Sequence, residues 1–457
     1  MKKLLSTICI SVICAALSAQ PLALSGGETQ AAVIIDIESG ETIYSYNPST
    51  WITPASLTKL FTTAAAIEKF SPTAKIKTQA FYNESTNELT IVGHADPTFD
   101  SKNFVWHSAD AFANDIAKAL KNKNITHISC VNFDCGFIQG ETLSPKRIWE
   151  DMGNYYGSAP QAFNIFDNTL QLTLVSPKEI GKDCTIKSIT PQIIESKAIT
   201  SYVKSYAKNA DSVYVFGTSA ENGQMYVSGA MPAGRTDFRV KAALPDPNTA
   251  FADTFLCLLT ERGIKANSKK LTNNLLPSAK GSLLTTSESP SIEAIAQKTN
   301  HDSNNLFADA LLLQLGGEPT SWNGSIAALR QYAKKATGSE PRFYDGSGLS
   351  PLGKATVLQF ANLLIHMHKS KYQKQYEGTL AIAGQTGTLR SFGRGTRLAG
   401  KMIGKSGSMT GVVAYAGIVS GADGKQFAVC VIVNNHSETS ASVKKAIANW
   451  IEKQIKL

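Results

Sequence analysis

Three short polar motifs have the residue types and spacing to do chemistry together. The first is Ser56-Leu57-Thr58-Lys59, at the start of a helical pattern over 57–70. Residues three apart share a helix face, so the Lys59 amine can reach the Ser56 hydroxyl. A desolvated lysine can take the proton of a serine and make it a nucleophile. Taken alone, such a tetrapeptide is far more often a solvated helix start with serine as the N-cap.

The second motif is Ser303-Asn304-Asn305, between helical patterns over 292–299 and 304–315. Its serine offers a second hydroxyl for proton relay, and the Asn305 amide can hold a peptide carbonyl. A polar helix cap is the simpler interpretation of this motif by itself.

The third motif, Lys405-Ser406-Gly407-Ser408, follows a strand predicted over 398–404 and stands at its end. A strand at a sheet edge binds an extended peptide by adding it as a further strand, and a lysine there can meet a terminal carboxylate. Because Gly407 has no side chain, we expect it to let a substrate approach the backbone closely.

The elements that must position these motifs form two α+β stretches around a β-rich middle. At the N-terminal side, 31–37 and 42–46 predict a hairpin before the first helix. At the C-terminal side, helical patterns are followed by strands at 398–404, 414–419 and 427–433 and a closing helix at 440–456. The Ser/Thr-rich residues 277–290 are typical of a linker.

The N-terminus and the composition restrict the setting. Met1-Lys2-Lys3 and the apolar run after it predict a signal peptide over 1–19, hence an exported protein of the periplasm or cell wall. With 457 residues, 43% hydrophobic and 18% charged, the chain has material for a sizeable core and is not disordered. Cleavage removes two lysines and no acid, which lowers the formal charge from +9 to +7. A basic surplus suits an anionic surface or polymer.

Five cysteines remain after the predicted signal peptide. Cys130 and Cys135 are five positions apart, so either a local disulfide or two small core residues would fit. The sequence has no Cys or His spacing typical of a metal site, so we expect no metal and no cofactor. No aromatic and basic residues alternate as in single-strand nucleic-acid binders, so we expect no nucleic-acid partner.

The ordered set Ser-x-x-Lys, Ser-x-Asn and Lys-[Ser/Thr]-Gly resembles that of penicillin-binding proteins and β-lactamases. Ser303 follows Ser56 by 247 positions, which indicates a large insert after the first catalytic helix. With Asp345-Gly346-Ser347-Gly348-Leu349-Ser350, the pattern resembles the class C low-molecular-mass penicillin-binding proteins of the penicillin-binding protein 4 type. That family implies a D-alanyl-D-alanine carboxypeptidase and endopeptidase.

The resemblance implies a role for each matching residue. Ser56 would be acylated, Lys59 would be its base, and Ser303 with Asn305 would relay a proton and bind substrate. The substrate-binding edge would consist of Lys405, Ser406 and Gly407, and the backbone N–H groups of Ser56 and Ser408 would form the oxyanion hole. Asp151 and Tyr156 match positions lining a pocket for the diamino acid of the stem peptide.

The implied fold class is α+β: a split penicillin-binding or β-lactamase-like transpeptidase domain, an antiparallel sheet flanked by helices, with a large β-rich insert of one or two subdomains. We place the catalytic domain at 24–75 and 285–457 and the insert at 76–284, with a nested β-rich subdomain at about 138–245. The implied partners are peptidoglycan stem peptides ending in D-Ala-D-Ala, with β-lactam antibiotics as covalent inhibitors. Peripheral membrane or wall association stays open, as does the oligomeric state.

Two other functions are considered. A β-lactamase needs a group that activates the deacylating water, for which Glu150 is the one tempting residue, and the long insert argues against it. A non-catalytic wall-binding module that keeps the fold would not need Ser56, Lys59, Ser303 and Lys405 together.

Overall fold

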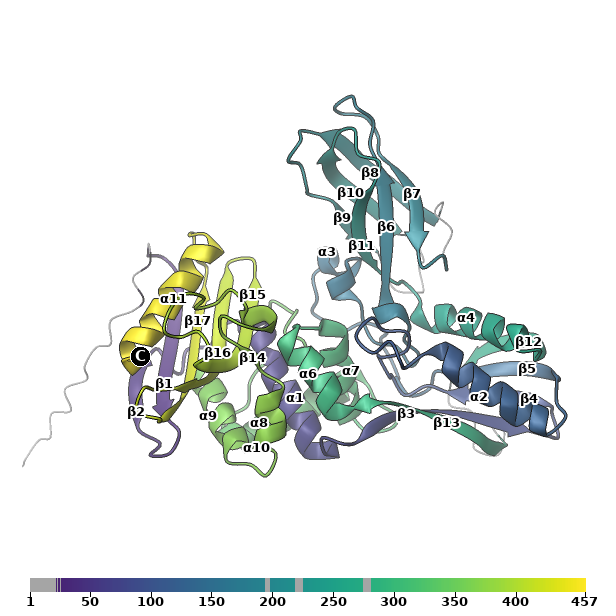
Figure 1. Cartoon of the computed structure of the whole chain (residues 1–457), viewed down its shortest axis with the longest axis horizontal. Coiled ribbons are helices and arrows are strands. Elements are labelled where there is room, and N and C mark those ends of the chain that lie inside the picture. The colour runs from purple at the N-terminus through teal and green to yellow at the C-terminus, as the bar shows by residue number, and fades with distance from the viewer. Residues whose placement is uncertain (1–21, 23, 25, 194–197, 218–224, 274–280) are drawn as a thin grey trace, which may run out of the picture.

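The computed structural model describes residues 22, 24, 26–193, 198–217, 225–273 and 281–457, so the predicted signal peptide lies outside the described residues. Its main sheet has six antiparallel strands in the order β14-β15-β16-β17-β1-β2 (Figure 1). Both ends of the chain contribute, because β1 pairs with β17 along its full length. The strands are β1 (Thr29–Asp36), β2 (Thr42–Tyr46), β14 (Ala381–Ile382), β15 (Met402–Met409), β16 (Val412–Ser420) and β17 (Gln426–Asn434).

Helices cover both faces of this sheet, which explains why β16 and β17 are buried almost throughout. One face packs against α11, where Ile447 and Ile451 are fully buried, and the other packs against α9 and the short η1. The helix α1 is buried nearly all round between α6, α7 and α8. The helices are η1 (Ala55–Leu57), α1 (Thr58–Phe70), α6 (Ile292–His301), α7 (Asn305–Leu315), α8 (Trp322–Thr337), α9 (Val357–His368), α10 (Gln373–Gly378), η5 (Gly387–Leu389) and α11 (Ser440–Ile455).

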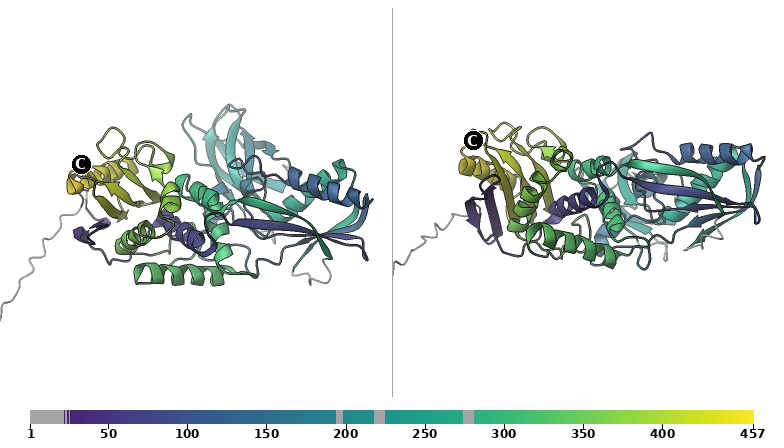
Figure 2. Two further views of the ribbon diagram at one scale, coloured as in Figure 1. Left: turned by 60° about the horizontal axis from the view of Figure 1, so that its bottom comes forward. Right: turned by 90° about the horizontal axis from the view of Figure 1, so that it is seen from below.

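Between α1 and α6 the chain builds a second, five-stranded sheet in the order β12-β5-β4-β3-β13. Figure 2 shows this sheet at the opposite end of the molecule from the six-stranded sheet, with α1 and α6 between the two. In α2, the apolar side chains of Phe112, Ile116 and Leu120 share one buried face, and the Ser108 hydroxyl caps the helix start. The elements are β3 (Lys75–Asn83), β4 (Glu88–Val92), α2 (Ala109–Asn122), β5 (His127–Asp134), α4 (Pro247–Glu261), β12 (Lys265–Thr272) and β13 (Ser282–Ser291).

The strand β13 corrects the linker predicted for 277–290. Residues 282–290 belong to a strand that pairs with β3, whereas 277–280 lie outside the described residues. Only Ser289 and Pro290 of this edge strand are buried, and its Ser/Thr-rich composition therefore looks like that of a loop.

A further lobe of two three-stranded sheets, β8-β10-β9 and β11-β6-β7, stands upright in Figure 1. Alternating residues such as Leu170, Leu172 and Leu174 point between the sheets and are fully buried. The strands are β6 (Thr169–Val175), β7 (Thr185–Thr190), β8 (Ile199–Tyr206), β9 (Tyr214–Phe216), β10 (Met225–Pro232) and β11 (Phe238–Ala243). The helical turns α3 (Trp149–Met152), η2 (Tyr155–Gly157) and η3 (Phe166–Asn168) connect the lobe to the rest.

All five cysteines of the described residues are free, so the local Cys130–Cys135 disulfide does not form. Cys130 lies within β5 and Cys135 directly follows it. Five residues of extended chain span roughly 16 Å and end on opposite strand faces, whereas a disulfide needs Cα atoms within about 7 Å.

Candidate active site

Ser56 lies in η1, the single turn that leads into α1, and its side chain is partly exposed. The Nζ atom of Lys59, one turn further on, donates a 3.0 Å hydrogen bond to the Ser56 Oγ atom. Ala55, the residue before the serine, has a φ of 47°, which is uncommon for a residue with a side chain. The turn therefore presents Ser56 in a constrained position above the buried lysine.

Lys59 is fully buried and has two further acceptors, the Asn305 Oδ1 atom at 2.6 Å and the Ser347 carbonyl at 2.7 Å. Burial lowers the pKa of Lys59 to about 7, against the opposing attraction of Asp309 and Asp345. A substantial fraction of Lys59 is thus neutral near pH 7 and able to accept the proton of Ser56.

A hydrogen bond joins the second and third motifs. Ser303 lies between α6 and α7, and its Oγ atom accepts a 3.0 Å hydrogen bond from the Lys405 Nζ atom. Lys405 also donates to the Ser406 carbonyl at 2.6 Å and is fully buried. Burial, and then the charge of Lys59, hold its pKa well below the usual range. Within the described part of the chain, no carboxylate pairs with Lys405.

The Lys405–Ser408 motif lies inside β15 and not at the end of a strand, which corrects the sequence-based placement. The strand extends that far because β16 pairs with all eight of its residues. On the other side, β14 pairs only with Ile403 and Gly404. The Ala383 N–H donates a hydrogen bond to the Met402 carbonyl from this side. Because the backbone groups of successive residues in a strand point to opposite edges, Ser406 and Ser408 direct their N–H and C=O groups to the same edge as Met402. The edge beyond β14 is therefore open beside Ser56.

Gly407 has a different reason for lacking a side chain from the one predicted. A Cβ atom at this position would lie 2.5 Å from the Pro54 carbonyl oxygen and 3.2 Å from the Ala414 Cβ atom. The close approach is therefore to the turn that carries Ser56. A side chain at this position would point at the turn of η1, so the glycine makes room for that turn, whereas the sequence predicts that it makes room for substrate.

The insert reaches the site through α3 and η2. The side chains of Asp151 and Tyr156 are hydrogen-bonded to each other, and burial raises the pKa of the Asp151 carboxyl. The Asn305 Nδ2 atom donates a 2.8 Å hydrogen bond to the Tyr156 carbonyl. Asp151 and Tyr156 are thus close to the Lys59–Asn305 pair, with partly exposed side chains.

A buried ion cluster beneath Lys59 was missed by the sequence analysis. The guanidinium of Arg147 pairs with Asp309, and its Nε atom lies 3.5 Å from the Asp345 Oδ2 atom, all three side chains being at most 1% exposed. One signal was available for Asp309, because it is the lone acid in the apolar run Leu-Phe-Ala-Asp-Ala-Leu-Leu-Leu of 306–313. No local pattern marks Arg147, because its partners are 162 and 198 positions away.

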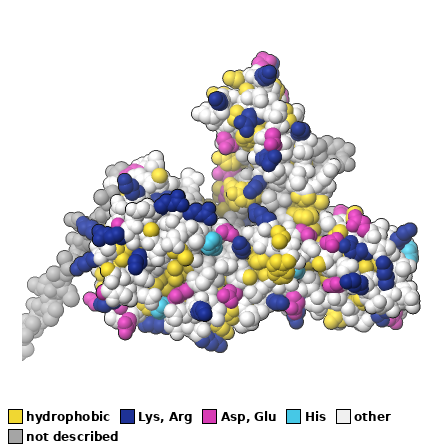
Figure 3. All heavy atoms as spheres, viewed as in Figure 1, with side chains coloured by type: hydrophobic (Ala, Val, Ile, Leu, Met, Phe, Trp, Pro, Cys, Tyr) yellow, Lys and Arg dark blue, Asp and Glu magenta, His cyan; other side chains and the backbone are white. Residues whose placement is uncertain are grey.

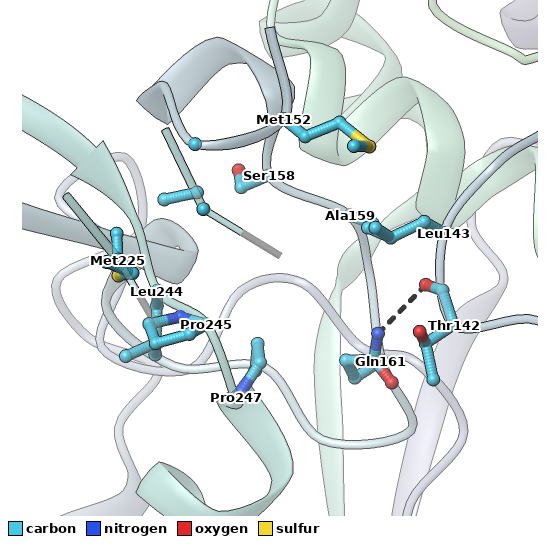
Figure 4. Close-up of a pocket in the computed structure, with 13 residues that line it drawn as sticks. Thr142, Leu143, Met152, Ser158, Ala159, Gln161, Met225, Leu244, Pro245 and Pro247 are labelled. Atoms are coloured by element: carbon cyan, nitrogen blue, oxygen red, sulfur yellow. Dashed lines mark hydrogen bonds between the residues drawn. The ribbon is translucent and has the colours of Figure 1, made fainter. Parts of the chain in front are cut away.

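A small cavity lies behind α3 and η2 (Figure 4). Met152, Ser158 and Ala159 line one side, and Gln161 donates a 3.0 Å hydrogen bond to the Thr142 carbonyl at its margin. None of the three motifs lines this cavity. The cavity lies next to the segment that carries Asp151 and Tyr156 and is not part of the Ser56 site.

The fold and the Ser56–Lys59 pair are those of a penicillin-binding serine peptidase. The model of the D-Ala-D-Ala carboxypeptidase 3 (S13) family matches residues 15–454, and the chain therefore belongs to that family of serine carboxypeptidases.

Known proteins are similar to this one along most of the chain. Penicillin-sensitive carboxypeptidase A of Dictyostelium discoideum is 26% identical, covering 86% of this chain and 79% of the relative. The D-alanyl-D-alanine carboxypeptidase of Actinomadura sp. (strain R39) is 23% identical, covering 92% and 81%.

Solved structures share the fold. Penicillin binding protein 4 from Haemophilus influenzae superposes with a TM-score of 0.81 at 22% identity, covering 95% of this chain and 98% of that one. A predatory peptidoglycan endopeptidase from Bdellovibrio bacteriovorus has a TM-score of 0.53 at 18% identity, covering 94% and 93%. The predicted fold class, a split penicillin-binding domain with a large insert, is confirmed.

Proposed function

We propose that this carboxypeptidase acts through an acyl-enzyme on Ser56, with Lys59 as the base. The Ser56 oxygen attacks the carbonyl carbon of the penultimate D-alanine while its proton passes to neutral Lys59. The C–N bond then breaks, and the departing amine of the terminal D-alanine receives a proton through the Ser303 hydroxyl. Water cleaves the ester, releasing the shortened peptide and restoring Ser56. The observation that carries this proposal is the 3.0 Å contact of buried Lys59 with Ser56.

The terminal carboxylate of the substrate is the group that fits Lys405. A buried ammonium group without a carboxylate partner is costly, and an incoming anion relieves that cost. Lys405 lies in the strand whose open edge can take the substrate as an added strand. Backbone N–H groups of Ser56 and Ser408 would stabilise the oxyanion, where one donor typically contributes about 10²–10³ in rate.

We also propose hydrolysis of peptidoglycan cross-links. The same acyl-enzyme forms with either of two leaving groups. One is the amine of a terminal D-alanine, and the other is the amine of the neighbouring stem peptide to which the D-alanine carbonyl is cross-linked. Solved structures of the same fold include peptidoglycan endopeptidases, which supports this second activity. Asp151 and Tyr156 would contact the diamino acid side chain of the stem peptide, an ammonium group suiting the Asp151 carboxylate.

The protein would act outside the cytoplasmic membrane, beside the anionic cell wall. This proposal rests on the N-terminal signal pattern. Separately, none of the described helices is long and apolar enough to cross a membrane. Figure 3 shows Lys and Arg side chains gathered along the rim of the part containing the six-stranded sheet. The exposed basic residues before β15 are Arg390, Arg394, Arg397 and Lys401.

Fluorescent penicillin and mass spectrometry test the proposal. The wild type should take up one label per chain on the Ser56 peptide, and Ser56→Ala should take up none while melting at the same temperature. Defined muropeptides, monomeric and cross-linked, should lose D-alanine or be cut into monomers. Labelling of Ser56→Ala equal to that of the wild type would refute the role of Ser56, and rapid nitrocefin turnover would favour a β-lactamase.

A further inference from the structure

Arg147 reaches the catalytic domain from the insert and contacts several backbone and side-chain groups there. Its side chain is 0% exposed. Besides pairing with Asp309 of α7, it donates to the Gly157 carbonyl at 3.1 Å and to the Ser347 Oγ atom at 3.3 Å. One side chain thus joins α7, η2 and the segment after Asp345.

Of the two acceptors of the Lys59 ammonium other than Ser56, one belongs to a residue that Arg147 contacts, and the other is held one residue away from an Arg147 contact. On one side, Asp309 accepts from the Ser347 backbone N–H at 3.1 Å, and the Ser347 carbonyl accepts from Lys59. On the other side, Asn305 accepts from Lys59 and donates to the Tyr156 carbonyl, one residue before Gly157. A movement of the Arg147 guanidinium would therefore reach Lys59 along two routes.

We propose that Arg147, paired with Asp309, is a positioning residue for Lys59, through which the insert holds the general base in place and sets its charge balance. This inference rests on the proposed function, in which Lys59 is the base. It makes the insert a part of the catalytic apparatus.

The charges around Lys59 predict the direction in which its pKa should move in each variant. The charged groups that act on the pKa of Lys59 are the carboxylates of Asp309 and Asp345 and the guanidinium of Arg147. Lys405 also faces this site, and the charge of Lys59 lowers the pKa of Lys405. The carboxylates raise the pKa of Lys59, whereas burial and Arg147 lower it. Loss of the Asp309 charge should therefore lower this pKa, and loss of the Arg147 charge should raise it.

The test measures the second-order rate constant of penicillin acylation against pH. The acid limb of the profile should move down by about one pH unit in Asp309→Asn and up by about one unit in Arg147→Gln, each unit being a tenfold change in rate on the limb. The double variant Arg147→Gln/Asp309→Asn should bring the limb back toward the wild-type position, because both charges leave together. Arg147→Lys should keep the limb and lose rate at every pH, because it keeps the charge and loses the planar contacts.

The matched control is Arg239→Gln, which removes an exposed arginine of the insert that pairs with Asp237. It should move neither the limb nor the rate. The inference would be overturned if the acid limb moved in the same direction in both single variants. It would also be overturned if the limb did not move in variants that still react with penicillin. If Arg147→Gln does not fold, Asp309→Asn, the double variant and Arg147→Lys decide. An unlabelled wild type would instead refute the proposed function.

Discussion

The side-chain amide of Asn305 donates a 2.8 Å hydrogen bond to the backbone carbonyl of Tyr156, 149 positions earlier in the chain. The oxygen of the same amide accepts from Lys59. A single side chain of α7 therefore touches the proposed base on one side and the inserted segment on the other.

Asn305→Ala should slow penicillin acylation by roughly 10², because it removes one acceptor of Lys59 and frees the Tyr156 segment. The neighbouring variant Asn304→Ala is the matched control. The Asn304 side chain caps α7 by accepting from the Phe307 N–H, so its loss should cost about 1 kcal/mol of stability and leave acylation near the wild-type rate. Stopped-flow acylation and thermal melts of both variants separate the two roles, and equal acylation rates would contradict the prediction.

The acylation rate of the wild type should rise with pH through a midpoint near 7. Lys59 must be neutral to accept the Ser56 proton, and its pKa lies at about 7, below the ordinary value of 10.5, mainly because the side chain is buried. Below the midpoint the neutral fraction, and so the rate, falls tenfold per pH unit. A limb centred above pH 9 would show that Lys59 titrates as an exposed lysine does.

Lys405→Met should stabilise the fold while it weakens the enzyme. It removes a buried amine whose charged form is disfavoured by burial and has no carboxylate partner in the described residues, and it puts a flexible apolar side chain of similar length in the same space. We expect a higher melting temperature and a kcat/KM reduced by about 10² for a peptide with a free terminal carboxylate, as for other lost charged contacts. The amide form of the peptide is the control, since wild type and variant should treat it alike.

Gly407→Ala should lower the free energy of unfolding by about 1–3 kcal/mol and slow acylation of Ser56. The added methyl would lie 2.5 Å from the Pro54 carbonyl, so either β15 or the turn carrying Ser56 must shift. Gly378→Ala is the control, because no atom lies within 4 Å of its added Cβ. Denaturant melts and labelling rates check the prediction, and normal acylation in a destabilised protein would contradict its second part.

The local elements around the motifs were predictable from the sequence because they depend on near neighbours. The first helix, the two helices around Ser303 and the buried strands β16 and β17 follow from hydrophobic periodicity. The sequence did not predict the strands that consist of polar residues and form only because a neighbouring strand pairs with them. Residues 282–290 and 405–409 are strands because β3 and β16 lie beside them, and no local signal reports a partner more than a hundred positions away or across a turn.

The sequence by itself determined the chemistry: a serine one helical turn from a lysine, a second serine with an asparagine, and a lysine before a glycine, in an order typical of one family. Only the tertiary structure decided what surrounds that chemistry. The burial of Lys59 and Lys405, the open edge of β15 and the Arg147–Asp309 pair arise when distant segments pack together. Desolvation and close charges depend on distances in space, which residue types and spacing along a chain do not specify.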